Sequence, residues 1–281
     1  MSDVTGLADG HWQWSGWLTP KGRVVALFAL LRFDSRSLWL LLPDADPAAL
    51  RDGLQRFVFR SKVTLTVRGD LHVAGGFARP SHAAGSRLSN DRHVELDAGT
   101  PDLPRTLRIA DALVASDGDA VLRWKAGDLR HGLPRLDASQ AGEWTPQQLS
   151  LERLQAFSVR KGCYPGQEIV ARTHFLGQAK RGLVLLEAEH DVAPGTEIVD
   201  EERVIGSMVS SVMCPPMYRA VSSSPTICAY ASKSPRSGRR RTSRSVSRRI
   251  SGMCIASVPF PSIVAERRRW NSACAVRTRT R

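Results

Sequence analysis

The chain has 281 residues, and its 40 lysine and arginine residues against 27 aspartate and glutamate residues give a formal net charge of +13. This excess lies at one end: residues 212–281 contain 15 basic side chains and one acidic one, whereas residues 1–211 contain 25 basic and 26 acidic ones. The five cysteines form no CxxC pair, and their odd number argues against a disulfide framework. No run is long enough to span a membrane and no secretory signal is visible, so a reducing, cytoplasmic setting is expected.

Residues 4–32 are typical of a β-hairpin. The first strand carries Trp12, Trp14 and Trp17, a Thr-Pro-Lys-Gly turn follows at 19–22, and an apolar strand returns over 23–31. We interpret the tryptophans as core residues rather than as a surface on which a ligand stacks.

The next stretch alternates between strand and helix patterns. Asp46 is a candidate N-cap with Pro47 at the first helical position, which predicts a helix to residue 59. Strands are predicted at 38–42, 63–67 and 71–77, residues 79–104 are polar and rich in turn formers, and short apolar pieces suited to later strands follow at 106–110 and 112–115. His72, His82 and His93 lack the spacing of metal ligands, and no metal site is predicted.

A helix is predicted over residues 119–131, ended by Gly-Leu-Pro at 132–134. Thr145 and Gln148 form a capping-box pattern that could open a second helix, although the local residues by themselves predict only a break here. Asp137 and Glu143 are read as surface charges.

The densest chemical pattern is Lys-Gly-Cys-Tyr-Pro-Gly-Gln-Glu at residues 161–168, which we call the signature loop. Its Pro-Gly pair at 165–166 suits the two central positions of a type II turn. A helix is expected next, with Glu168 in its first turn, where the helix dipole favours a carboxylate. Lys161 and a helix N-terminus would favour the thiolate form of Cys163.

Strands are predicted at 183–186, 196–199 and 204–210, with a turn over 191–195. Beyond residue 212 no periodic pattern continues, and four of the five cysteines lie in this basic tail. The tail could be an arm that binds nucleic acid, a solvated disordered segment, or the product of a reading-frame change near residue 212. We favour the last hypothesis.

The signature loop resembles the Lys-Gly-Cys-Tyr-x-Gly-Gln-Glu motif of the YgfZ family, whose members bind folate, support iron–sulfur enzymes and are relatives of the glycine-cleavage aminomethyltransferase. Other segments are similar to the family in the same order, from about residue 4 to about residue 210. They are 20–23, 60–63, 132–134, 146–151 and 171–181. The resemblance implies that the Pro-Gln pair at 146–147 forms a loop before a short helix, which is the alternative to a helix opened at Thr145.

The resemblance implies an α+β, aminomethyltransferase-like folate-binding fold. Its expected parts are a truncated first part of the folate-binding domain (1–36), a ferredoxin-like middle domain (37–118), a second part of the folate-binding domain (119–181), the start of an incomplete C-terminal β-barrel (182–211) and an aberrant basic tail (212–281). Relatives carry a few tens of residues before the position of Met1.

The resemblance also implies tetrahydrofolate as cofactor and iron–sulfur assembly machinery or client iron–sulfur enzymes as partners, with an indirect role in tRNA modification. Cys163 would be the reactive thiol, assisted by Lys161. The residues expected to contact folate or to orient the loop are Arg23, Tyr164, Gln167, Glu168 and Arg172. Direct nucleic-acid binding and membrane association are not expected.

Two alternatives stay open at this point. The chain could be a tetrahydrofolate-dependent enzyme like the aminomethyltransferase, or a basic-tailed RNA-binding protein. The motif does not fix whether a reaction is catalysed.

Overall fold

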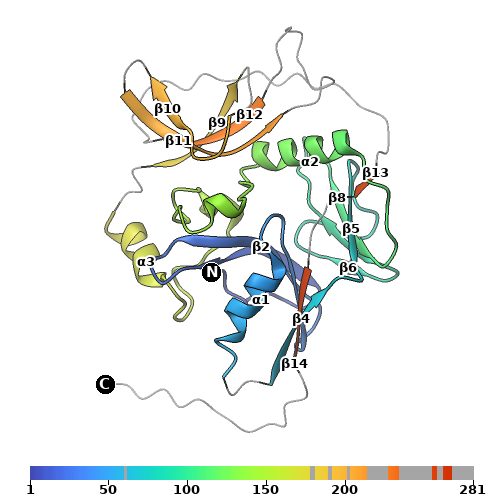
Figure 1. The fold of residues 1–281 in the computed structure, drawn as a ribbon. Coiled ribbons are helices and arrows are strands. Elements are labelled where there is room, and N and C mark those ends of the chain that lie inside the picture. Colours follow the sequence, from blue (N-terminus) through green and yellow to red (C-terminus); the bar gives the residue numbers. More distant parts are fainter. Residues whose placement is uncertain are drawn as a thin grey trace, which may run out of the picture.

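The structure is a computed structural model that describes residues 1–59, 62–177, 181–188, 192–200, 203–213, 227–233, 255–257 and 262–267. In these residues the chain forms three antiparallel sheets and three α-helices. Figure 1 shows the sheets arranged around a centre where the N-terminus lies, with helix α2 running beneath the third sheet.

The first sheet has the strand order β1-β2-β3-β14-β4. Its strands are β1 (His11–Leu18), β2 (Val24–Arg32), β3 (Ser37–Leu41), β14 (Ser262–Arg267) and β4 (Val63–Arg68). The predicted hairpin is confirmed, because β1 and β2 pair along their length and the Thr19 N–H donates to the Arg23 carbonyl at 2.8 Å. β3 and β4, assigned to the middle domain from the sequence, lie in the same sheet as this hairpin.

Helix α1 (Pro47–Gln55) begins where the sequence predicts. The Asp46 carboxylate accepts hydrogen bonds from two backbone N–H groups of the first turn, at 3.0 and 3.2 Å. The helix ends four residues before the predicted residue 59, because the chain tightens into a turn in which the Phe57 N–H donates to the Leu54 carbonyl at 2.9 Å. The side chains of Phe57 and Phe59 are therefore exposed.

The second sheet has the order β13-β5-β8-β7-β6. Its strands are β13 (Ile255–Ser257), β5 (His72–Gly76), β8 (Thr106–Ala110), β7 (Val94–Asp97) and β6 (Ser89–Asn90). β6 and β7 lie within 79–104, where no strand was predicted. Strand β7 buries Glu95, whose carboxylate accepts a hydrogen bond from Arg108 at 3.1 Å and further bonds from two backbone N–H groups.

Helix α2 (Gly118–Arg130) is capped by Asp117 and packs against strands of the second and third sheets. The predicted stop is confirmed. Gly132 has a φ of 78°, and the Leu133 N–H donates back to the Asp128 carbonyl at 2.9 Å. The chain therefore reverses sharply at the end of the helix.

The capping-box hydrogen bonds form without an α-helix. The Gln148 side chain accepts from the Thr145 N–H at 3.0 Å, and the Thr145 hydroxyl accepts from the Gln148 N–H at 3.3 Å. A short 3₁₀ helix, Leu151–Leu154, follows, which agrees with the loop alternative. The residues on either side of it, Ser150 and Gln155, both have left-handed backbones with φ of 49° and 51°.

The third sheet has the order β10-β11-β12-β9, and the three strands predicted at 183–186, 196–199 and 204–210 are confirmed. Its fourth strand, like β13 and β14, comes from residues 212–281, where no strand pattern was expected. Its strands are β10 (Glu197–Asp200), β11 (Arg203–Met213), β12 (Ile227–Lys233) and β9 (Gly182–Ala188). Residues 60–61, 178–180 and 191, which belong to expected motifs or turns, lie outside the described residues. Most of the basic tail also lies outside them, so the reading-frame hypothesis stays a prediction.

One apolar cluster joins the first hairpin to helix α2 and to the segments that follow this helix. It combines Leu18 of β1, Leu129 of α2, Leu151 of the 3₁₀ helix, Val170 of helix α3 (Gln167–Phe175) and Val209 of β11, all buried. Among the described residues no helix has both the length and the apolar character that crossing a membrane requires.

Candidate functional site

The signature loop contains the predicted type II turn. Gly166 has φ of 78° and ψ of 2°, and the Gln167 N–H donates to the Tyr164 carbonyl at 3.1 Å. Helix α3 (Gln167–Phe175) starts directly after it, with Glu168 in its first turn as expected. The local sequence therefore determines the backbone of the loop.

Side chains of the loop donate hydrogen bonds to its own backbone and to the backbone just before it. The Gln167 side-chain amide donates to the Lys161 carbonyl at 3.0 Å, and the Tyr164 hydroxyl donates to the Ser158 carbonyl at 3.0 Å. Burial raises the pKa of Tyr164 to about 12, so this phenol is a neutral hydrogen-bond donor. Gln167 and Tyr164 thus hold the loop in shape.

The Lys161 ammonium points back toward the start of the chain. It donates to the Ser2 carbonyl at 3.1 Å and lies 5.2 Å from the centre of the Tyr164 ring. Burial lowers the pKa of Lys161, and the nearby Asp3 carboxylate acts in the opposite direction. The influence of this ammonium on Cys163 stays a prediction.

Two turns far apart in the sequence meet beside the loop. A Cβ atom on Gly166 would lie 2.6 Å from the Gly22 Cα and 2.6 Å from the Thr19 carbonyl oxygen. Gly22 also has a positive φ, of 70°. The hairpin turn and the signature turn therefore fit together only through a contact between two glycines.

The remaining predicted site residues fall into two groups. Cys163, Glu168 and Arg172 are exposed. Arg23 is half-buried, and its guanidinium donates to the Glu143 carbonyl at 2.6 Å, which fastens the loop before the 3₁₀ helix. The structure thus brings Lys161, Tyr164 and Gln167 together, leaves the thiol accessible, and gives Arg23 a contact that holds a loop.

A cavity of about 590 Å³ lies elsewhere, between the first hairpin, the second sheet and α2. None of the seven residues predicted from the sequence lines it. Its lining includes aromatic, charged and polar side chains, among them Trp12, Trp14, Trp124, Arg105, Asp128 and His131.

The aromatic walls of the cavity come from separate elements. Trp12 and Trp14 of β1 meet edge to face with ring centres 5.8 Å apart, and the Trp12 ring N–H donates to a backbone carbonyl at 3.0 Å. Trp124 of α2 is 2% exposed and packs under the Arg105 guanidinium at 4.5 Å. The two tryptophans of β1 therefore pack in the core, as interpreted from the sequence, and also face a cavity, which that interpretation missed.

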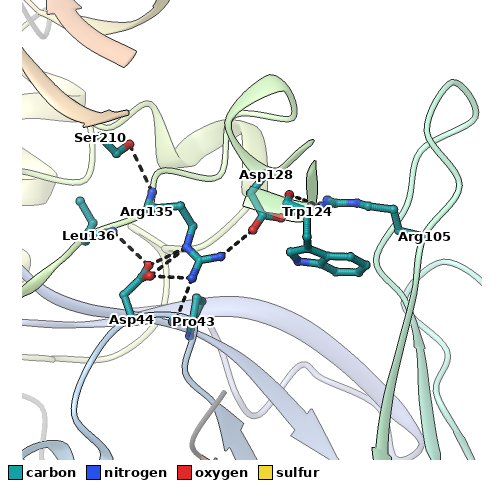
Figure 2. Close-up of polar contacts among 8 residues, drawn as sticks. All are labelled: Pro43, Asp44, Arg105, Trp124, Asp128, Arg135, Leu136 and Ser210. Atoms are coloured by element: carbon teal, nitrogen blue, oxygen red, sulfur yellow. Dashed lines mark hydrogen bonds and ion pairs between the residues drawn. The ribbon is translucent and has the colours of Figure 1, made fainter. Parts of the chain in front are cut away.

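The charged wall of the cavity continues into a chain of ion pairs, Asp44–Arg135–Asp128–Arg105 (Figure 2). The last three members are buried, whereas the Asp44 side chain is 20% exposed. One Asp128 oxygen accepts from Arg105 at 2.7 Å, and the other accepts from Arg135 at 2.9 Å. The Arg135 guanidinium also donates three hydrogen bonds, of 2.6 to 3.0 Å, to the Asp44 carboxylate. We call these four residues the ion-pair chain. No motif in the sequence pointed to them.

Two further groups give the cavity its polarity. The Nε atom of Arg105 is buried and has no hydrogen-bond partner among the described residues. Burial lowers the pKa of His131, and the positive charge of Arg105 acts in the same direction, so the ring is largely neutral at pH 7. The cavity thus combines flat apolar walls with hydrogen-bonding groups.

Comparison with solved structures places this architecture in a known class. Aminomethyltransferase T of the glycine cleavage system from Bartonella henselae superposes with a TM-score of 0.57 at 12% identity, over 93% of this chain and 76% of that one. At that identity the likeness shows the fold alone. The protein therefore has the α+β aminomethyltransferase fold that the sequence predicted.

Curated relatives identify the family. The chain is 31% identical to an uncharacterized protein of Haemophilus influenzae over 201 residues, covering 70% of this chain and 68% of that one. It is 30% identical over 221 residues to the tRNA-modifying protein YgfZ of Klebsiella pneumoniae, covering 69% of this chain and 65% of the relative, which is less than two thirds of its length. No model of a known protein family matches the chain. The chain belongs to the YgfZ family.

Proposed function

We propose that this chain is a folate-binding accessory protein that supports iron–sulfur cluster assembly or repair and, through it, tRNA modification. The observation that carries the proposal is the separation of two sites in one molecule: a cavity suited to a flat polar ligand, and an exposed thiol on a fixed loop. The tRNA-modifying name of the Klebsiella relative agrees with it.

The cavity fits the chemistry of tetrahydrofolate. Its volume of about 590 Å³ is in the range that small-molecule sites occupy. Trp12 and Trp14 offer apolar faces for a bicyclic ring, and Asp128 offers acceptor oxygens for ring N–H groups. When bound, tetrahydrofolate supplies a carrier for one-carbon units.

The exposed thiol is suited to the transfer of an iron–sulfur cluster between proteins rather than to holding a cluster by itself. Iron–sulfur clusters are held by several cysteine thiolates, and the described residues contain no group of three or more His, Cys, Asp or Glu side chains that could hold a metal. Cys163 would therefore act together with ligands from a partner protein. Its exposure on the signature loop permits such an encounter.

A folate-dependent transferase is a second candidate because of the aminomethyltransferase fold. Neither of the two carboxylates that line the cavity is free to act as a catalytic base, however, because each already accepts hydrogen bonds from two groups. Asp128 accepts from two guanidinium groups, and Asp97 accepts from the backbone N–H groups of Gly85 and Gly99. Transfer of the one-carbon unit from an aminomethylated lipoyl carrier to tetrahydrofolate, with release of ammonia and of the free lipoyl dithiol, would establish the transferase.

Folate binding can be tested directly. Tetrahydrofolate should quench the fluorescence of the purified chain, and the substitution Trp12→Phe should remove a large part of the quenching. Trp39 packs against Phe33 and is absent from the cavity lining, so W39F is a matched control that should keep the quenching. Saturable quenching lost equally in both variants would contradict a site in this cavity.

The role of the thiol is tested in a bacterial strain that lacks its own family member. Iron–sulfur-dependent modification of tRNA, measured by mass spectrometry of hydrolysed tRNA, should be restored by the unmodified chain but not by C163A or C163S. Both variants should still bind tetrahydrofolate, since Cys163 does not line the cavity. Full restoration by C163A would refute the assignment.

A further inference from the structure

The ion-pair chain links the cavity to the first sheet through one buried arginine. The Arg135 side chain is 8% exposed, and its guanidinium contacts carboxylates on two sides, Asp44 and Asp128 (Figure 2). Only Asp128 of these two lines the cavity of about 590 Å³. Arg135 itself is absent from the cavity lining, so it acts on a ligand through Asp128.

Asp128 depends on its guanidinium partners. Its side chain is 2% exposed, and each of its oxygens accepts one N–H, from Arg105 or Arg135. A carboxylate has about four acceptor positions, so these two bonds leave others for a ligand. A buried carboxylate that loses a cationic partner takes up a proton more readily, and its protonated oxygen then donates a hydrogen bond, which a donor group of a ligand cannot accept.

Arg135 is itself fixed from behind. Asp44 accepts from Nε and Nη2 of Arg135 and also from the Leu136 N–H at 3.0 Å, and the Pro43 carbonyl accepts from Nη2 at 2.9 Å. Burial acts to lower the pKa of Arg135, but the two carboxylates outweigh it and raise the pKa. The guanidinium is therefore a permanent, oriented cation.

We propose that Arg135 is a positioning residue of the cavity: held by Asp44, it keeps Asp128 ionised and oriented, so that Asp128 accepts hydrogen bonds from donor groups of the bound folate. This inference rests on the proposed folate binding. It predicts that an intact ion-pair chain makes affinity independent of pH near neutrality and that loss of Arg135 makes affinity fall in acid.

The other charged groups near Asp128 have to be held constant. Arg105 contacts it directly, and His131, Asp97 and Arg153 line the same cavity. Since the His131 ring can titrate in the relevant range, every comparison is made in an H131Q background as well as in the unmodified chain.

The experiment measures the affinity of the full chain for 5-formyltetrahydrofolate by calorimetry between pH 6 and pH 8. In R135M, where Asp128 keeps only its hydrogen bond from Arg105, we expect affinity to fall by more than about twofold between pH 8 and pH 6. R135K retains the positive charge, so its affinity should again depend little on pH. The affinity of the unmodified chain should change by less than about twofold between pH 6 and pH 8.

Arg108→Met is the matched control. It removes a guanidinium from another buried carboxylate, Glu95, whose side chain is 1% exposed and does not line the cavity. R108M should therefore lose stability but keep the flat binding profile. A structural defect alone would affect R135M and R108M alike.

Each outcome decides the matter. A folded R135M with a flat profile overturns the inference and leaves folate binding intact. If R135M does not fold, D44N takes its place, because it loosens Arg135 without removing it: a profile that declines in acid supports the inference, and a flat one overturns it. Absence of binding by the unmodified chain overturns both the inference and the proposed function.

Discussion

In the signature loop the reactive groups are exposed while the backbone around them is fixed by Tyr164, Gln167 and the contact between Gly22 and Gly166. In the cavity the arrangement is reversed, because the charged groups themselves are buried and hold one another. The loop can therefore meet a large partner without rearranging. The cavity can bind a small ligand through dipoles and charges that are already oriented.

If this contrast is correct, the largest loss of stability comes from the cavity. Asp128→Ala leaves two buried guanidinium groups without their shared carboxylate, and we expect the free energy of unfolding to fall by about 3–5 kcal/mol. Urea unfolding followed by tryptophan fluorescence measures the loss.

Asp9→Ala is the control for this substitution. Asp9 pairs with Arg32 at the surface, where its side chain is 55% exposed. Such a pair contributes about 1 kcal/mol or less. Equal losses in D128A and D9A would show that burial does not distinguish the two ion pairs.

In the signature loop we expect stability to depend on the backbone conformation rather than on charged side chains. Gly166→Ala puts a methyl group 2.6 Å from the Gly22 Cα and forces a side chain into a left-handed conformation, which we expect to cost about 2–4 kcal/mol. Gly142 also has a positive φ, of 85°, but nothing within 4 Å of the added Cβ. G142A should therefore lower the free energy of unfolding by only about 1 kcal/mol. If G166A and G142A lost similar amounts of stability, the contact between Gly22 and Gly166 would contribute nothing.

These two regions also differ in how far the sequence predicts them. The turn at Pro165-Gly166 and the cap at Asp46 were predicted because each depends on neighbours along the chain. The members of the ion-pair chain lie on four separate segments, and each alone reads as a surface charge. Only the tertiary fold brings them together.

Strand β7 was missed for a related reason. Its residues 94–97 alternate apolar and acidic side chains, and the buried Glu95 reads as a turn or surface residue until Arg108 is seen beside it. Likewise Trp12 and Trp14 predicted a strand correctly, but no local pattern tells a cavity wall from an ordinary core position.

A smaller effect concerns pH and the cavity. Burial lowers the pKa of His131 below its usual 6.5. Between the two values the unfolded chain binds more protons, so the free energy of unfolding decreases as pH falls below 6.5, by less than about 1.4 kcal/mol per pH unit.

Unfolding of H131Q in urea at pH 7.5 and pH 5.5 measures this contribution, because the substitution removes it. H82Q changes an exposed side chain and should behave like the unmodified chain. If the free energy of unfolding of H131Q differed between pH 7.5 and pH 5.5 as much as that of the unmodified chain, His131 would not be the group responsible for the pH dependence.

The smallest effect is expected at the thiol. Cys163 is exposed, so C163A should change the free energy of unfolding by less than about 0.5 kcal/mol. Iodoacetamide should label Cys163 in the native protein, measured by mass spectrometry of its peptide, without prior unfolding. A large loss of stability, or labelling only in urea, would place the thiol inside the structure and break the contrast between the two regions.

The contact between Gly22 and Gly166 also has a consequence for the order of folding during synthesis. The two residues are separated by about half of the chain, so the hairpin turn leaves the ribosome long before its counterpart exists. At about 5–20 residues per second the delay is on the order of ten seconds. During that interval the end of the first hairpin is uncovered, and the thiol loop can take its final shape only after this early segment is already in place.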